Sequence, residues 1–217
     1  MLTDLPANGA SFRTAAIRRA RFVFAIRDEW GFNGCVCVGL GEWYSTVAPG
    51  TGLHPRPASA SILKQWFPEI NPVGWSSTWY PSRRGEDVEE IHDRVAGYLS
   101  VFVPHLERTY PQHKVIMLVS HAATIIALVR GLLGNRNLPV RVGCCSLTVF
   151  TRKEGDDWKV IGGWEDKKFV DGTHLKGGAL RDWGFEDAEI ANGKVVTVTE
   201  SFLAPMLITP TGYRRQG

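Results

Sequence analysis

The 217-residue sequence lacks most features that would assign it to a special class of protein. It has four cysteines, as the pairs Cys35/Cys37 and Cys144/Cys145, and neither spacing is that of a zinc knuckle or a redox CxxC motif. Because adjacent cysteines rarely bridge each other, we expect buried, reduced thiols and a reducing compartment. No apolar run reaches transmembrane length, and no secretory signal sequence is recognisable.

A strong charge bias is also missing. The 25 basic and 22 acidic residues leave a formal net charge of +3, which is too small to indicate direct binding of nucleic acid. GxSxG, P-loop, HExxH and EF-hand motifs are all absent from the sequence. We therefore predict no metal and no cofactor. Hydrophobic residues make up 44% of the chain, which is enough for one sizeable globular core.

Hydrophobic periodicity predicts an α/β fold. Apolar side chains at steps of three and four predict a helix over residues 86–109. The continuous apolar run 114–120 is typical of a central strand that is buried on both faces of a parallel sheet. A second helix is expected over 122–134, with Gly134 as its end.

Outside these segments, the sequence predicts secondary structure less clearly. Residues 43–85 are rich in Pro, Gly and Ser and hold four of the eight tryptophans, so we expect a lid or binding loop there. The alternative is that at least half of these tryptophan rings merely pack the loop onto the core. Short strands are expected at 21–26, 35–38, 146–150 and 158–164, the last two joined by a hairpin turn.

Two residues carry candidate chemistry. His121 falls where the predicted strand 114–120 ends and a helix begins, and ligands of open α/β sheets bind at such ends. The helix N-terminus favours anions, and the small side chain of Ala122 leaves room for a phosphate. Glu42 follows a glycine turn and could protonate a leaving oxygen. From position alone, a histidine that merely caps a turn is equally compatible with His121, and most glutamates that follow a turn are simply solvated.

Four segments, taken together, resemble the histidine phosphatase (phosphoglycerate mutase-like) superfamily. They are residues 39–57, 79–95, 119–134 and 140–150, within a likeness that spans roughly residues 38–190. Within the superfamily, the sequence resembles fungal domains related to the small tau subunit of RNA polymerase III transcription factor IIIC. The resemblance implies a mostly parallel sheet with helices on both faces.

The resemblance also implies a function. Members of the superfamily are metal-independent phosphomonoesterases that work through a phosphohistidine. His121 matches the second histidine, which contacts phosphoryl oxygens, Glu42 matches the acid, and the backbone N–H of Ala122 matches the group that faces the phosphate. Implied partners are phosphorylated small molecules or phosphoproteins, phosphotyrosine included, and subunits of a transcription factor complex. The resemblance also implies that the protein is nuclear or cytoplasmic.

The sequence departs from the family at its N-terminal side. It contains no Arg-His-Gly motif, which carries the family's nucleophile, and the surroundings of Arg18 and Arg19 do not match a further family arginine. We interpret residues 1–37 as an atypical N-terminal segment, truncated or replaced by foreign, mis-spliced or diverged sequence. A phosphatase-like domain is expected over 38–164 and an extension over 165–217.

Two functions therefore stay open. The first is a phosphatase, and the second is a catalytically dead domain that binds a phosphorylated ligand or a protein. Because the nucleophile motif is missing, we expect little or no turnover from this polypeptide.

Overall fold

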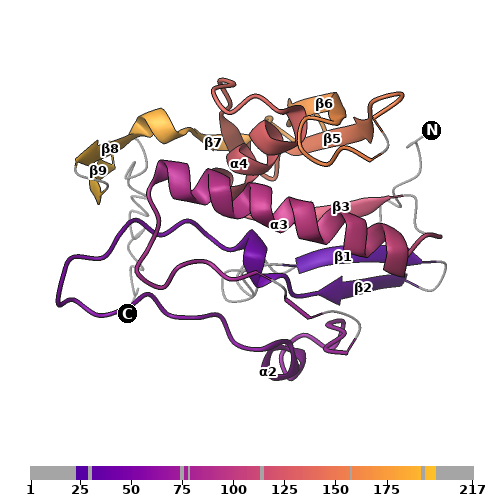
Figure 1. Ribbon diagram of the computed structural model, residues 1–217, viewed down its shortest axis with the longest axis horizontal. Coiled ribbons are helices and arrows are strands. Elements are labelled where there is room, and N and C mark those ends of the chain that lie inside the picture. Colours follow the sequence, from indigo (N-terminus) through magenta and orange to yellow (C-terminus); the bar gives the residue numbers. More distant parts are fainter. Residues whose placement is uncertain are drawn as a thin grey trace, which may run out of the picture.

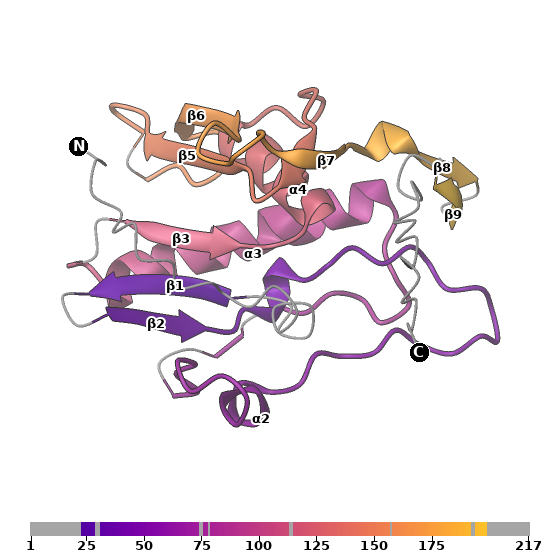
Figure 2. The same ribbon diagram turned by 180° about the vertical axis from the view of Figure 1, so that it is seen from behind.

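The fold combines two packed helices with several small sheets. A computed structural model describes residues 23–28, 31–73, 76–77, 79–112, 115–156, 158–191 and 194–198. The main helices, α3 (Val88–Thr109) and α4 (Ala122–Leu133), lie against each other, and α3 runs along one face of a three-stranded sheet (Figures 1 and 2). The α/β class expected from the sequence is confirmed.

Helix α3 forms where the periodicity predicts it. Asp87 begins the helix with a capping box: its carboxylate accepts from the Glu90 backbone, and the Glu90 side chain accepts from the Asp87 backbone. One face is buried in the core, through side chains that include Ile91, Val95, Tyr98, Leu99, Phe102 and Leu106. The helix continues through Pro104 to Thr109.

The strand–helix unit at 114–134 is confirmed, with one correction. Strand β3 (Ile116–Val119) leads directly to His121, the N-cap of α4, and Gly134 ends α4 in the left-handed region at φ +70°. Strand β3, however, pairs antiparallel with β1 (Val23–Asp28), which pairs antiparallel with β2 (Gly31–Cys35). In the described part of the sheet, β3 is thus an edge strand.

The burial of β3 also differs from the expectation. Ile116 and Leu118 pack against the core, whereas Met117 and Val119 are each 40% exposed. The strand is therefore buried on one face, as is usual for an antiparallel sheet. All strand pairs that the structure describes are antiparallel, so the parallel arrangement is not found among them.

The chain beyond α4 forms small antiparallel pairs. Strand β5 (Leu147–Arg152) pairs with β6 (Trp164–Asp171), so the expected strand at 158–164 is wrong and a longer loop replaces the tight hairpin. Strand β4 (Val142–Cys144) pairs with β7 (Leu180–Trp183), and β8 (Ala188–Ala191) with β9 (Lys194–Val198). Between them, the 3-10 turn η2 (Phe185–Asp187) places Phe185 in the main core.

Residues 43–85 are largely irregular, with one short helix, α2 (Ala60–Lys64). Leu63 and Ile70 of this segment form a small second cluster with Val36. Trp43 packs on the main core, whereas Trp66 is 77% exposed. Trp75 lies outside the described residues, as do Arg18, Arg19 and the start of the predicted strand 21–26.

The four thiols differ in their surroundings. Cys35 and Cys37 are buried, whereas Cys144 and Cys145 are exposed, so the expectation of burial is wrong for the second pair. Cys144 is the last residue of β4, and Cys145 follows it in a turn with a left-handed conformation at φ +59°. None of the helices that the structure describes is both long and apolar enough to cross a membrane.

Candidate active site

Glu42 and His121 lie in contact. Oε2 of Glu42 is 2.7 Å from Nδ1 of His121, and the two side chains are 32% and 34% exposed. The second oxygen of Glu42 accepts from the Trp43 backbone N–H at 3.0 Å. The structure therefore brings together the two side chains that the sequence analysis selects, at a position that solvent reaches.

The turn before Glu42 is held by side chains of α3, of α4 and of the junction between β3 and α4. This turn is η1 (Val38–Leu40), and the carbonyl groups of Gly39, Leu40 and Gly41 all accept side-chain hydrogen bonds. Ser120 Oγ donates to Leu40 at 2.7 Å, and Thr124 donates to Gly41. Because Ser120 and Thr124 stand on either side of His121, these bonds fix Glu42 relative to the imidazole.

Arg94 of α3 also donates hydrogen bonds to this turn. Its Nη1 donates to the Gly39 carbonyl at 2.7 Å and its Nη2 to the Gly41 carbonyl at 3.2 Å. Its Nε lies 2.8 Å from the Glu86 carboxylate, and both side chains are buried. Burial lowers the pKa of Arg94, and the nearby carboxylates of Glu86 and Glu42 oppose that effect. The guanidinium is thus a buried charge that donates three hydrogen bonds at the base of the site.

The ring of Trp43, the residue after Glu42, belongs to a group of packed aromatic side chains. Trp43 donates its indole N–H to the Glu86 carbonyl at 2.7 Å and packs edge-on against Phe185 at 5.4 Å. Phe185 also contacts His92, whose Nε2 lies 3.1 Å from Arg130 Nη1. Burial lowers the pKa of His92, so this histidine is a neutral acceptor in the wall of the core.

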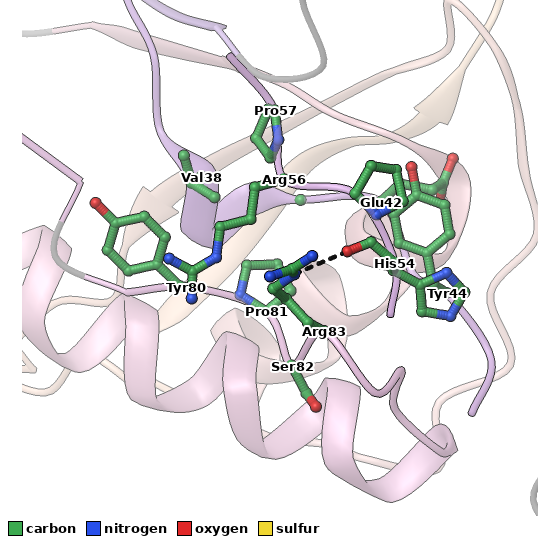
Figure 3. A pocket seen from close by; sticks show the side chains of 12 residues that line it. Val38, Glu42, Tyr44, His54, Arg56, Pro57, Tyr80, Pro81, Ser82 and Arg83 are labelled. Atoms are coloured by element: carbon green, nitrogen blue, oxygen red, sulfur yellow. Dashed lines mark hydrogen bonds between the residues drawn. The ribbon is translucent and has the colours of Figure 1, made fainter. Parts of the chain in front are cut away.

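A pocket opens next to Glu42. Its lining comes from the turn at Glu42 and from residues 54–57 and 80–83 of the irregular segment (Figure 3). Arg56 and Arg83 line it together with Tyr44 and Tyr80. Part of the segment 43–85 therefore forms a wall beside the candidate acid.

Comparison with known proteins relates the chain to a family. Residues 59–166 match the model of the histidine phosphatase superfamily (branch 1). The chain contains a histidine phosphatase domain. The match includes α3, β3, His121 and α4, whereas Glu42 precedes it.

The histidine phosphatase domain also has a curated relative. The chain is 30% identical over 194 residues to the transcription factor tau 55 kDa subunit of Saccharomyces cerevisiae. The alignment covers 75% of this chain and 44% of the yeast protein, so the chain spans less than half the length of that relative.

The start of α4 carries two of the candidate site residues. His121 and Ala122 lie at the N-terminus of α4, where backbone N–H groups and the helix dipole favour an anion. Within the described residues, no group of three or more His, Cys, Asp or Glu side chains could hold a metal ion.

Sequence reasoning missed the supporting residues of the site. Arg94 is a charged side chain between apolar positions of α3, and charged residues are normally solvated. Its step of three from Ile91 and four from Tyr98 places it on the buried face, which is a usable signal. Ser120 and Thr124 could have been found as hydroxyl residues that flank the candidate histidine.

Proposed function

We propose that the domain binds phosphate monoesters at the Glu42–His121 pair. The observation that carries the proposal is the 2.7 Å contact between these side chains at the N-terminus of α4. A protonated imidazole offers charge-assisted hydrogen bonds to phosphoryl oxygens, and the N–H of Ala122 adds a backbone donor. Glu42 is the candidate acid for the leaving oxygen.

Phosphatase activity needs a nucleophile, which phosphate binding does not. The superfamily mechanism needs an attacking histidine, and this sequence has no Arg-His-Gly motif to supply one. We therefore infer a phosphate-binding domain with little or no phosphatase activity in residues 1–217. Aromatic side chains near Glu42, including Trp43 and Tyr44, favour an aryl phosphate such as phosphotyrosine as ligand.

The binding proposal is tested by titrating residues 1–217 with phenyl phosphate and following backbone amides by NMR. Saturable shifts are expected at Glu42, His121 and Ala122, and H121A should weaken binding about tenfold, as loss of a charge-assisted bond does. The matched control is H174A, since His174 is an exposed turn residue that is not part of the Glu42–His121 pair. Unchanged affinity in H121A, with circular dichroism confirming the fold, would sink the proposal.

The similarity to a transcription factor subunit favours a second role for the same domain. The curated relative is named as a subunit of transcription factor tau. We infer that this chain acts in the nucleus as an interaction domain within a corresponding complex. The test is to tag the protein in its host and ask whether it copurifies with the other subunits of that factor. A protein confined to the cytoplasm, without those subunits, contradicts this role.

A further inference from the structure

Two neighbouring thiols lie on the surface, where β4 leads into β5. Cys144 ends β4 and Cys145 follows it, and both side chains are free and exposed. The face of β4 that carries Cys144 is open to solvent, because Leu180, its partner on β7, is 67% exposed. Cys35 and Cys37 are buried instead, and burial raises the pKa of Cys35 to about 11. Of the four thiols, Cys144 and Cys145 are therefore the two that a dissolved ion reaches.

The turn holds these two thiols next to each other. The Ser146 backbone N–H donates to the Gly143 carbonyl at 3.2 Å and closes the turn. Strand β4 is paired with β7 before the turn and β5 with β6 after it, so both ends are anchored. Neighbouring Cα atoms are about 3.8 Å apart. Rotation about the Cα–Cβ bonds alone therefore lets both sulfur atoms contact one ion.

Local backbone preference does not explain a cysteine at position 145. Cys145 has a φ of +59°, in the left-handed region where glycine or asparagine is usual and a longer side chain is disfavoured. A residue in such a conformation is a reason to look for a function of its side chain. Here the side chain is a second exposed thiol beside the first.

The chemistry of the pair favours one soft ion between the sulfurs. A disulfide between adjacent residues is strained, whereas an ion inserted between the sulfurs lengthens the bridge. Thiolates are soft ligands and select soft ions over magnesium or calcium. Within the described residues, no third His, Cys, Asp or Glu completes a metal centre. The pair therefore suits an ion that takes two or three sulfur ligands better than structural zinc, which takes four protein ligands.

We propose that Cys144 and Cys145 form a dithiol site for a soft ion that takes two or three sulfur ligands. Phenylarsine oxide is the matching probe, because its trivalent arsenic already carries one phenyl group and accepts two thiols. Two As–S bonds form, the bonds from arsenic to oxygen break, and the two thiol protons leave with that oxygen as water. Neither arsenic nor sulfur is oxidised or reduced in this step.

The site is tested by titrating the reduced protein with phenylarsine oxide and counting the thiols that still react with Ellman's reagent. The parent protein should lose two reactive thiols at one equivalent, and dimercaptopropanol, a competing dithiol, should restore them. C144S and C145S should each bind the arsenical about 100-fold more weakly, because the second As–S bond no longer forms within one molecule. The matched control is S146A, which changes the same turn without removing a thiol and should not change the affinity.

The double variant C144S/C145S keeps only the buried pair. Arsenical binding that persists in it at the parent affinity overturns the proposal, because the ion then binds at Cys35 and Cys37. Single variants that bind as tightly as the parent also overturn it, since one thiol would suffice. Circular dichroism checks that each serine variant is folded, as expected for exposed positions. The result does not depend on phosphate binding at the Glu42–His121 pair, which H121A tests separately.

Discussion

Glu42 and His121 come from distant parts of the sequence and meet at 2.7 Å, with the turn before Glu42 bonded to the residues that flank His121. Each side chain is about one-third exposed, at 32% and 34%, so solvent screens their attraction. For such a pair, a double-mutant cycle of E42Q and H121Q should give a coupling energy of up to about 1 kcal/mol.

The cycle is measured by urea unfolding at pH 6.5, at low salt and in 1 M NaCl. The coupling should shrink in high salt, because added ions screen exposed charges. A coupling energy of zero under both conditions would mean that the two side chains do not interact in solution.

Phosphatase turnover is the second prediction. Residues 1–217 should hydrolyse p-nitrophenyl phosphate no faster than the H121A variant, after circular dichroism has confirmed that both are folded. Phosphoryl transfer depends on an in-line nucleophile, and removing the nucleophile of a covalent mechanism costs about 10⁴- to 10⁶-fold in rate. Robust hydrolysis that H121A abolishes would reveal a nucleophile outside the Arg-His-Gly motif.

Arg94 provides the third prediction. R94A should lower the free energy of unfolding by about 3–5 kcal/mol, because it leaves the buried Glu86 carboxylate without its partner. The double variant R94M/E86L should recover part of this loss, since it removes both buried charges. Urea unfolding measures both effects.

The control for Arg94 is R136A. Arg136 pairs with Glu89 and Asp93 on the surface, where its side chain is 44% exposed, so its loss should cost less than about 1 kcal/mol. If R94A and R136A cost the same, the buried ion pair does not hold the turn before Glu42 in the way the structure indicates.

The fourth prediction concerns pH and His92. Burial, reinforced by Arg130 and Arg136, lowers the pKa of His92 in the folded state. The unfolded chain takes up the proton first, at a pKa of about 6.5. The stability that neutral His92 contributes is therefore present above about pH 6.5, and it is lost as the pH falls toward the folded-state pKa.

The measurement compares the urea concentrations at the midpoint of unfolding at pH 7.5 and at pH 5.5. The H92Q variant should lose less stability over this range than the parent protein, whereas H174Q, which changes an exposed histidine, should behave like the parent. Identical pH dependence in H92Q and the parent would show that His92 is protonated as easily in the folded as in the unfolded chain.

Local patterns predicted the parts of the fold that depend on nearby residues. The apolar period of α3, the run that forms β3 and the glycine that ends α4 are all readable within one segment. Strand pairing depends on residues far apart in sequence, and here the parallel partner expected for β3 is replaced by the antiparallel β1. The exposure of Cys144 and Cys145 was missed because it depends on where β4 ends and on the left-handed turn residue that follows, and composition reveals neither.

The candidate site was predictable to a similar degree. Glu42 and His121 were selected by their positions after a turn and a strand, and the structure places them in contact. The burial of Arg94 required tertiary information, because charged side chains are exposed by default. Whether these residues bind phosphate stays a prediction for the experiments above.

Phe185 belongs to the main core, although it lies beyond the end of the family match. The family match ends at residue 166, yet Phe185 and Trp183 cover Trp43 and His92. Arg141 ties this covering turn to β4 through Asp182 and Asp187. A fragment cut where the match ends would leave aromatic rings of the core in water, so the smallest piece of this chain worth expressing extends at least to Asp187.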